Sequence, residues 1–513
     1  MTKLKDDVYF ISRLSLAALS GGIAYFAYPR PGWWPLIFLV VAGFQIAVSK
    51  TTYPRALAIG FVFGFTFFAS QVWWISQYLG AEPLVALATL EALFVSAAAL
   101  LWVYLERHLK HPFALALAFA SVWTAREWFS THFPYGGFPW SRLAMSQSNS
   151  PLAGWVFFGG LSLLTFVLAL TTSLAVFYLP KLRVESSRRS SAMLLVGALA
   201  VLVIVPNLTW SSPSIGKLKV AGIQGNANAG LFANNTPGTI LGNHLKVTHD
   251  FLKSDQRRGV QLVVWPENAS DINPQDNFQV AQTLQTLIDQ KLRVPLLFGT
   301  LTQFNGQMFN STLLWQPDLG ITDQYDKKRP IPFAEYVPDR AFWNALAPDL
   351  IGLIYRGYTF GTRDPIYEVH GARLGDLICF EIAIDDIIQN INDAGANAIV
   401  SQSNNADFGH SDEAYQQYAL MKLRAIETGL PIINVSTTGP SGAFDGRGNQ
   451  IAFTDAFQAR YFVANLPLTS STTPAMGYGR YFDLANVTLL TAGILLVEIR
   501  RRRTKASQRR GEL

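Results

Sequence analysis

Cysteine is almost absent from this chain: a single thiol, Cys379, occurs in 513 residues. One cysteine excludes an intramolecular disulfide framework and any metal site built from several thiolates. The seven histidines form no HExxH motif and no comparable cluster, so we predict no catalytic metal. We therefore expect any chemistry to be performed by ordinary side chains.

Charged residues are also scarce, at 15% of the chain, whereas hydrophobic residues make up 50%. This balance is too apolar for a soluble protein of this size and indicates a membrane protein that carries a soluble part. The net charge is +6, and much of the excess lies in the tail 500–510. A basic tail after an apolar run is typical of a membrane-flanking segment, so we predict no nucleic-acid partner.

Long apolar stretches fill the N-terminal part of the chain, each close to the roughly 20 residues that a membrane-spanning helix requires. We expect eight spans in all. Their ranges are 8–28, 32–49, 56–76, 82–105, 112–130, 152–179, 192–210 and 479–499. The first begins like a signal peptide, but no obvious cleavage site follows it, so we interpret it as a retained helix.

The segment between the seventh and eighth spans has ordinary globular composition and strand-like runs such as QLVVW and ANAIVSQS. We therefore expect a membrane domain at 1–210, a globular domain at 211–478, and a final span with a basic tail at 479–513. This division resembles a soluble enzyme or binding domain attached to a membrane platform.

Positive charge is distributed unevenly around the expected spans. With the N-terminus inside, the inside segments carry 17 Lys and Arg residues, whereas the short outside loops carry two. The positive-inside rule then places both termini in the cytoplasm and the globular domain outside. A lone thiol is unexpected there, because oxidising compartments threaten unpaired cysteines.

The outer end of the fifth span carries two features of interest. Arg126 and Glu127 either form an ion pair or reach the interface by snorkelling. The loop PYGGFPWSRL, at 134–143, is unlike a simple helix anchor, and one interpretation is that it shapes access for a lipid chain.

Three polar stretches of the globular domain lie where a strand would end. LVVWPENAS carries Glu267, QYDKKRPIPFAEYVPD carries Lys327 and Glu335, and GDLICFEIA carries Cys379 and Glu381. A thiol nucleophile needs a base, and a partly buried carboxylate can serve where no histidine stands out. A lysine can stabilise the oxyanion that acyl transfer forms. The spacing of these residues in the sequence does not exclude two other interpretations. The thiol could be a small buried hydrophobic group, and the charged groups could be ordinary surface residues.

Along essentially its whole length, the chain resembles the apolipoprotein N-acyltransferase family, the membrane branch of the nitrilase or carbon-nitrogen hydrolase superfamily. VVWPEN, ICFE and YDKKRPIPFAEYVP match the family's motifs, the last resembling YxKxHLVPFGEYVP. IQGN, MFNSTLL, SNNADFG, RAIETGLPIINVSTTGPS and GGFPW match in the same order. The resemblance implies that Glu267 is the general base, Lys327 the catalytic lysine and Cys379 the nucleophile.

The resemblance also implies a nitrilase-like αββα sandwich for 211–478 and an enzyme that needs no cofactor. The implied reaction takes a fatty acyl chain from a membrane phospholipid, usually phosphatidylethanolamine, as a thioester. The acceptor is the α-amino group of the N-terminal diacylglyceryl-cysteine of an apolipoprotein, and the setting is the bacterial inner membrane with a periplasmic catalytic domain. We expect Glu335 and Glu381 to position other groups rather than to carry protons.

Some positions depart from the family's pattern. Asp407 stands where the family often has tryptophan, and the usual lysine-tryptophan pair is missing from ANAGLFANN, at 227–235. Arg329 replaces a histidine. These departures leave the catalytic residues intact and concern substrate contacts.

Other functions remain as alternatives. A membrane-tethered amidase or nitrilase-type hydrolase would use the same three residues but pass the acyl group to water. A non-enzymatic lipoprotein scaffold would have no need of an intact Glu267, Lys327 and Cys379. A transporter is disfavoured, because the obvious intramembrane charges lie near span ends and no internal repeat is evident.

Overall fold

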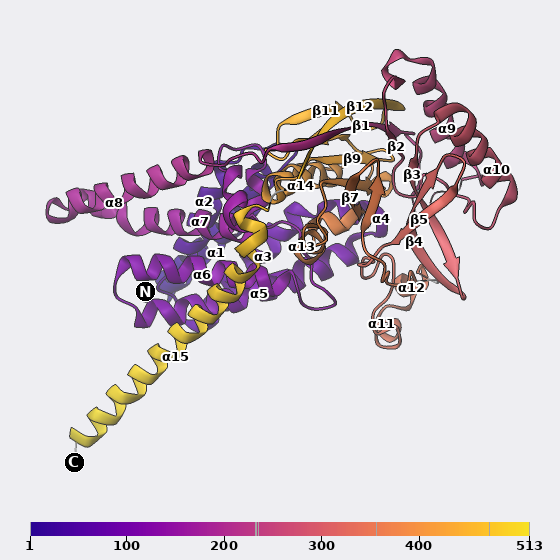
Figure 1. Cartoon of the computed structure of the whole chain (residues 1–513). Coiled ribbons are helices and arrows are strands. Elements are labelled where there is room, and N and C mark those ends of the chain that lie inside the picture. Colours follow the sequence, from indigo (N-terminus) through magenta and orange to yellow (C-terminus); the bar gives the residue numbers. More distant parts are fainter. Residues whose placement is uncertain (1, 231–232, 234, 355–356, 471, 512–513) are drawn as a thin grey trace. The chain divides into compact units, whose positions relative to one another are not determined.

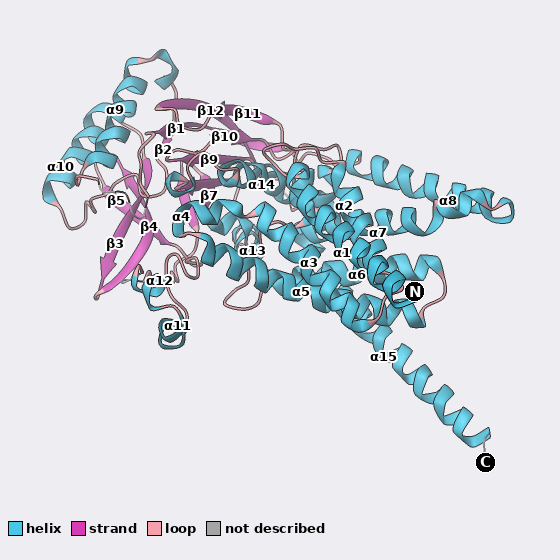
Figure 2. Cartoon of the chain, turned by 180° about the vertical axis from the view of Figure 1, so that it is seen from behind, coloured by secondary structure: helices cyan, strands magenta, loops and turns pink. Residues whose placement is uncertain are grey.

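The computed structural model describes residues 2–230, 233, 235–354, 357–470 and 472–511 (Figure 1). The chain forms two compact units. The first comprises Met1–Ser76, Gly80–Thr209 and Pro474–Leu513, and the second comprises Gln77–Leu79 and Trp210–Thr473. Among the described residues, β-strands occur only in the second unit (Figure 2).

Eight helices of 13 residues or more build the described part of the first unit. They are α1 (Thr2–Ala27), α2 (Leu36–Val48), α3 (Tyr53–Gln71), α5 (Ala81–His108), α6 (Pro112–Ser130), α7 (Val156–Tyr178), α8 (Glu185–Ile204) and α15 (Arg480–Gly511). Helices suit these apolar sequences, because a helix pairs its own backbone polar groups where lipid offers no partner.

Within the part of the chain that the structure describes, six helical segments are long and apolar enough to cross a membrane, so the predicted count of eight spans is not confirmed. They are Asp6–Ala27, Tyr53–Gln71, Ala81–His108, Ala153–Arg183, Glu185–Asn207 and Ala475–Arg503. The predicted second span is the 13-residue helix α2. Thirteen residues make a helix about 20 Å long, against a hydrocarbon core of about 30 Å. The predicted fifth span is α6, whose second half carries charged residues.

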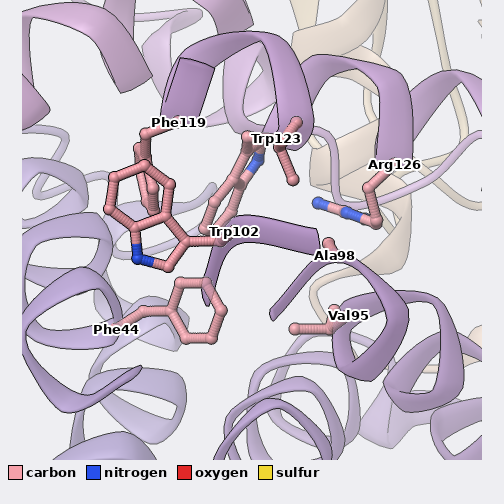
Figure 3. A pocket seen from close by; sticks show the side chains of 8 residues that line it. Phe44, Val95, Ala98, Trp102, Phe119, Trp123 and Arg126 are labelled. Carbon is pink, nitrogen blue, oxygen red and sulfur yellow. The ribbon is translucent and has the colours of Figure 1, made fainter. Parts of the chain in front are cut away.

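Aromatic side chains fill part of the interior of the first unit. Phe44 of α2, Trp102 of α5, and Phe119 and Trp123 of α6 line a small pocket that Arg126 also borders (Figure 3). The rings of Trp102 and Phe119 meet edge to face with centroids 5.2 Å apart, and those of Phe44 and Trp123 do so at 5.6 Å. These favourable ring contacts hold α2, α5 and α6 together.

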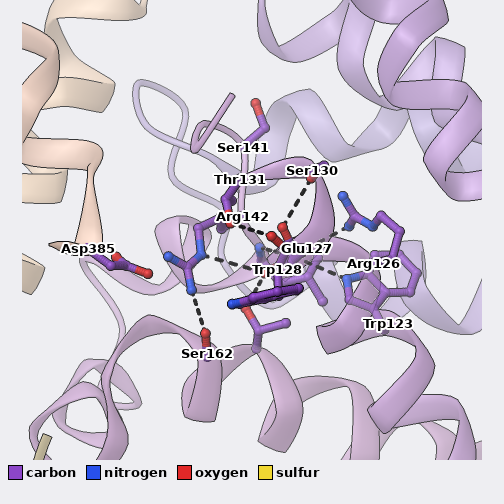
Figure 4. A network of polar contacts seen from close by, with 12 residues as sticks. Trp123, Arg126, Glu127, Trp128, Ser130, Thr131, Ser141, Arg142, Ser162 and Asp385 are labelled. Atoms are coloured by element: carbon purple, nitrogen blue, oxygen red, sulfur yellow. Dashed lines mark hydrogen bonds and ion pairs between the residues drawn. The ribbon is translucent and has the colours of Figure 1, made fainter. Parts of the chain in front are cut away.

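The charged pair near the end of α6 is buried. Glu127 lies 3.5 Å from Arg126 and 3.8 Å from Arg142, measured between carboxylate oxygens and guanidinium nitrogens. It also accepts hydrogen bonds from the Trp123 indole and the Leu143 backbone N–H, at 3.2 and 3.0 Å (Figure 4). The ion-pair interpretation is confirmed, and the carboxylate anchors the chain just beyond the GGFPW loop.

Two six-stranded sheets form the framework of the second unit. The first has the order β12-β1-β2-β3-β4-β5 and the second the order β11-β10-β9-β8-β7-β6. The strands of the first are β1 (Ser214–Gln224), β2 (Leu262–Val264), β3 (Leu296–Phe304), β4 (Gln307–Gln316), β5 (Gly320–Asp326) and β12 (Arg460–Thr469). Those of the second are β6 (Ile366–Val369), β7 (Ala372–Ile378), β8 (Ala398–Ser403), β9 (Ile432–Ser436), β10 (Ser441–Phe444) and β11 (Gln450–Thr454).

Each sheet has three parallel strands at its centre and antiparallel neighbours outside them. The parallel sets are β1, β2 and β3 in the first sheet and β7, β8 and β9 in the second. Chain segments that leave the carboxyl ends of parallel strands gather at one edge of a sheet, where α/β folds commonly bind ligands. Glu267 follows β2 and Cys379 follows β7 at such ends.

The two sheets pack face to face through one apolar core, and helices cover their outer faces. Buried residues of both sheets form the core, including Val220, Leu262, Leu374 and Val400. Residues of α9 (Thr239–Lys253) and α10 (Phe278–Thr286) pack on the outer face of the first sheet. Helices α13 (Asp385–Asp393) and α14 (Glu413–Thr428) cover the second. The predicted αββα sandwich is confirmed.

One buried carboxyl links the two sheets of the sandwich. Asp376, in β7, accepts a hydrogen bond from the Thr312 hydroxyl, in β4, at 2.5 Å. The same hydroxyl lies 2.8 Å from that of Tyr367. Burial raises the pKa of Asp376 to about 8. The group is therefore protonated in the folded protein near neutral pH.

The protonated Asp376 gives the stability of the protein a predictable pH dependence. An unfolded aspartate has a pKa of about 4, so the contribution of Asp376 to stability is greatest below that pH and is lost as the pH rises toward 8, by about 1.4 kcal/mol per pH unit. In Asp376→Asn, Tm in detergent should fall less steeply between pH 5 and pH 8 than in the wild type. The matched control is Asp323→Asn, on the exposed part of β5. Equal slopes for wild type and Asp376→Asn would contradict this prediction.

Candidate active site

Glu267 is a buried carboxylate held by two donors. It accepts hydrogen bonds from Asn310 Nδ2 at 2.7 Å and from the Asn404 backbone N–H at 2.6 Å. Lys327 Nζ lies 3.7 Å from its Oε1 atom. Burial raises the pKa of Glu267, against the opposing effect of Lys327. A carboxylate with a raised pKa is a better proton acceptor, as a general base requires.

Lys327 follows β5 and is buried between two carboxylates. Its Nζ donates to Glu335 Oε1 at 2.8 Å and lies within ion-pair distance of Glu267. Burial acts to lower the pKa of Lys327, but the two carboxylates outweigh it, and the net shift is upward. The side chain therefore stays an ammonium ion, suited to stabilising an oxyanion rather than to accepting a proton.

Glu335, in the proline-rich segment after β5, contacts both Lys327 and Asn310. Its Oε1 atom accepts from Lys327 and, at 3.1 Å, from Asn310 Nδ2, and its Oε2 atom accepts from the Ile331 backbone N–H at 2.7 Å. Asn310 thus bridges Glu335 and Glu267. These contacts fit a carboxylate that orients the lysine.

Cys379 occupies a sharp turn between β7 and a short 3-10 helix, Cys379–Ala383. Its φ of 54° lies in the left-handed region, which side chains other than glycine rarely adopt and which is often found at functional sites. Burial raises the pKa of the thiol, the carboxylates of Glu267, Glu413 and Glu335 raise it further, and Lys327 lowers it. The resting group is therefore a thiol that needs a base.

Glu381 is fully buried two residues after the thiol. It accepts hydrogen bonds from the Tyr325 hydroxyl at 2.9 Å and from the backbone N–H groups of Ile378 and Lys328 at 3.0 and 2.8 Å. The carboxylate therefore ties the turn that carries the thiol to the segment that carries the lysine. These contacts fit the predicted role of Glu381, which is to position other groups.

Three further residues contact the predicted ones and were not singled out by the sequence. Asn310 and Asn404 donate to Glu267, and Gln417 Nε2 donates to Cys379 Sγ at 3.6 Å. Asn310 lies in MFNSTLL and Asn404 in SNNADFG. A polar residue inside a motif of mostly apolar or small residues is the sequence feature that could have pointed to them.

Two places where the chain departs from the family's pattern, Asp407 and the described Gly230 of the stretch 227–235, lie close to each other. Asp407 is half-buried, and a side chain added at Gly230 would overlap its Oδ1 atom. Residues 231, 232 and 234, in the stretch without the lysine-tryptophan pair, lie outside the described residues. Among the residues that the structure describes, no group of three or more His, Cys, Asp and Glu side chains could hold a metal ion.

Glu267 and Lys327 are 3.7 Å apart, and both lie close enough to Cys379 to change the pKa of its thiol. A carboxylate, an ammonium group and a thiol thus share one buried site. Such a site can carry out acyl transfer through a thioester: the carboxylate takes the thiol proton, the sulfur attacks a carbonyl carbon, and the ammonium stabilises the oxyanion. The arrangement suits a substrate that is sheltered from water.

Comparison with known proteins matches both halves of the chain. Residues 20–174 match the apolipoprotein N-acyltransferase N-terminal domain, and residues 220–473 match the carbon-nitrogen hydrolase family. An amidase from Nesterenkonia sp. is similar in structure, with a TM-score of 0.37 and 15% identity over 50% of this chain and 92% of its own.

Two curated relatives match nearly the full length. An apolipoprotein N-acyltransferase of Mycolicibacterium smegmatis is 30% identical over 94% of this chain and 84% of its own length. One of Pseudomonas syringae pv. tomato is 28% identical over 94% of this chain and 96% of its own. On these similarities the chain belongs to the apolipoprotein N-acyltransferase family, with a carbon-nitrogen hydrolase domain as its second half.

Proposed function

We propose that this protein is an acyltransferase that completes lipoprotein maturation. It moves a fatty acyl chain from a membrane phospholipid to the α-amino group of the N-terminal diacylglyceryl-cysteine of an apolipoprotein. The observation that carries the proposal is the buried site of Glu267, Lys327 and Cys379 in a chain that is similar to N-acyltransferases over its length. A hydrolase is disfavoured, since the full-length relatives carry the name of an acyltransferase.

The first half-reaction loads the enzyme. Glu267 takes the proton of the Cys379 thiol, and the sulfur attacks the ester carbonyl carbon of the phospholipid. Lys327 stabilises the oxyanion of the tetrahedral intermediate, a contribution of about 10²–10³ in rate for one such donor. The ester C–O bond breaks, the leaving alkoxide receives the proton from Glu267, and a lysophospholipid departs. The acyl group stays as a thioester.

The second half-reaction transfers the acyl group from the enzyme to the acceptor. The α-amino group of the acceptor, as the free amine, attacks the thioester carbonyl, and Glu267 accepts a proton from the attacking nitrogen. The C–S bond breaks as the amide forms, and the thiolate regains its proton from Glu267. Each substrate meets a different form of the enzyme, as in other ping-pong reactions, and the two steps need no cofactor.

The finer features of the proposal concern donor and location. The donor is phosphatidylethanolamine, as the family resemblance implies. The enzyme lies in the bacterial inner membrane with 1–210 and 479–513 as its membrane parts, 211–478 in the periplasm and both termini in the cytoplasm. The 17-to-2 distribution of Lys and Arg supports this orientation.

The test uses purified full-length protein, a synthetic diacylated lipopeptide and vesicles of one phospholipid at a time. With phosphatidylethanolamine vesicles, the lipopeptide should gain the mass of one acyl chain, and phosphatidylcholine and phosphatidylglycerol vesicles should serve less well. A lipopeptide with an acetylated α-amino group is the control and should stay unmodified. Release of free fatty acid with an unchanged lipopeptide would instead identify a hydrolase.

A further inference from the structure

A buried amide touches the reacting sulfur from a helix outside the three motifs. Gln417 lies on the buried face of α14, and its Nε2 atom donates to Cys379 Sγ at 3.6 Å. The two residues are 38 positions apart in the chain. A side-chain amide carries an acceptor at one end and two N–H donors at the other, so its orientation decides whether it favours an anion on the sulfur.

The orientation of this amide follows from its neighbours. Asn405 Nδ2 donates to Gln417 Oε1 at 2.8 Å and to Glu413 Oε2 at 2.9 Å. Asn405 Oδ1 in turn accepts from the Ser436 hydroxyl at 2.6 Å. Both ends of the Asn405 amide are therefore in use, its two N–H groups as donors and its oxygen as acceptor. With Gln417 Oε1 held by Asn405, the Gln417 N–H group points to the sulfur.

The surroundings of the thiol make such a donor useful. Glu267, Glu335 and Glu413 all disfavour a negative charge on Cys379, and Lys327 is the cation that opposes them. Lys327 is also bound by Glu335 and is needed for the oxyanion. An N–H donor is stronger toward an anion than toward a neutral group, so Gln417 can stabilise the sulfur selectively once its proton has left.

We propose that Gln417 is a further catalytic residue, whose amide N–H stabilises the thiolate of Cys379, and that Asn405 and Glu413 are positioning residues that hold this amide in orientation. The S–H bond breaks, its proton passes to Glu267, and the sulfur keeps the electron pair while the N–H group of Gln417 bonds to it. No covalent bond of Gln417 changes. The inference rests on the proposed function, in which this thiolate is the nucleophile.

The test measures the thiolate directly. Because Cys379 is the only cysteine, alkylation of the full-length protein by iodoacetamide, followed by intact mass, reports one site. Rates are measured without phospholipid from pH 6 to pH 11, because burial raises the pKa of the thiol. In Gln417→Leu the midpoint of the pH profile should rise by about one unit, which lowers the rate near pH 7.5 about tenfold.

Two further variants separate this role from a purely structural one. Gln417→Glu can still accept the bond from Asn405, so it should fold, but it turns an oxygen to the sulfur and should raise the midpoint more than Gln417→Leu does. Gln417→His offers one acceptor and one donor, as the amide does, and should restore the wild-type midpoint. The control is Gln416→Leu, because neighbouring helical side chains point about 100° apart, and its midpoint should stay unchanged.

An unchanged midpoint in folded Gln417→Leu and Gln417→Glu would overturn the proposal, as would an equal rise in Gln416→Leu. Failure of this proposal can be distinguished from failure of the proposed acyltransferase function. If the wild type alkylates and the Gln417 variants shift, but no acyl adduct forms with phospholipid, the donor role stands and the acyltransferase assignment fails.

Discussion

Cys379→Ala is expected to abolish both half-reactions. Incubated with phospholipid alone, the wild type should gain the mass of one acyl chain, and hydroxylamine should remove it because thioesters react with that amine. The variant should gain no mass and should transfer no acyl chain to a lipopeptide, since no other cysteine can replace the nucleophile. Intact mass measures the first result, and the mass of the lipopeptide measures the second.

A matched experiment shows whether the adduct is productive. Addition of a diacylated lipopeptide to the loaded wild type should discharge the acyl group onto the lipopeptide, whereas a lipopeptide with a blocked α-amino group should not. An acyl adduct on Cys379→Ala that withstands hydroxylamine would place the nucleophile elsewhere. Turnover by this variant at the wild-type rate would exclude covalent catalysis by the thiol.

Glu267→Gln is expected to give the second largest loss. The amide keeps the size of the side chain, but it cannot take the thiol proton. Its single oxygen can accept from only one of Asn310 and Asn404, which bond to different oxygens of the carboxylate. Loss of a general base typically costs about 10²–10⁴ in rate. The rate of adduct formation, measured by quenched intact mass, should fall by this factor and should recover partly at high pH, where hydroxide can remove the proton.

The control for this variant is Glu368→Gln, which makes the same change on the exposed side of β6. It should load at the wild-type rate. A Glu267→Gln variant that loads as fast as the control, in a folded sample, would assign the base to another group.

The candidate catalytic residues that could be identified from the sequence all lie at the ends of strands. Glu267, Lys327 and Cys379 each follow a run of strand residues, and polar side chains at strand ends stand out against an apolar run. Their placement in one site depends on two sheets whose strands are far apart in the chain, but strand ends of this fold class meet in predictable places. The αββα arrangement was predicted from the resemblance to the nitrilase superfamily, because the local patterns alone indicate strands but not how two sheets pack.

The supporting residues depend on contacts that no local pattern encodes. Gln417 is one polar residue among several on α14, and only the packing of that helix against the 3-10 turn brings it to the sulfur. The oriented amide of Asn405 likewise depends on Ser436, from another strand. The predicted count of eight spans is not confirmed for a different reason: apolar composition marks α2 as a span, but its helix is too short to cross a bilayer alone.

The buried carboxylate at the end of α6 bears on how this protein reaches its membrane. Taken as an isolated segment, α6 carries Arg126 and Glu127 near its end without the later partner Arg142, so these charges are only partly compensated. The partner arrives only after the following loop has been synthesised. We therefore expect α6 to become fully stable in the membrane only after α7 has joined it, because the Thr165 hydroxyl of α7 also donates to the Glu127 carboxylate.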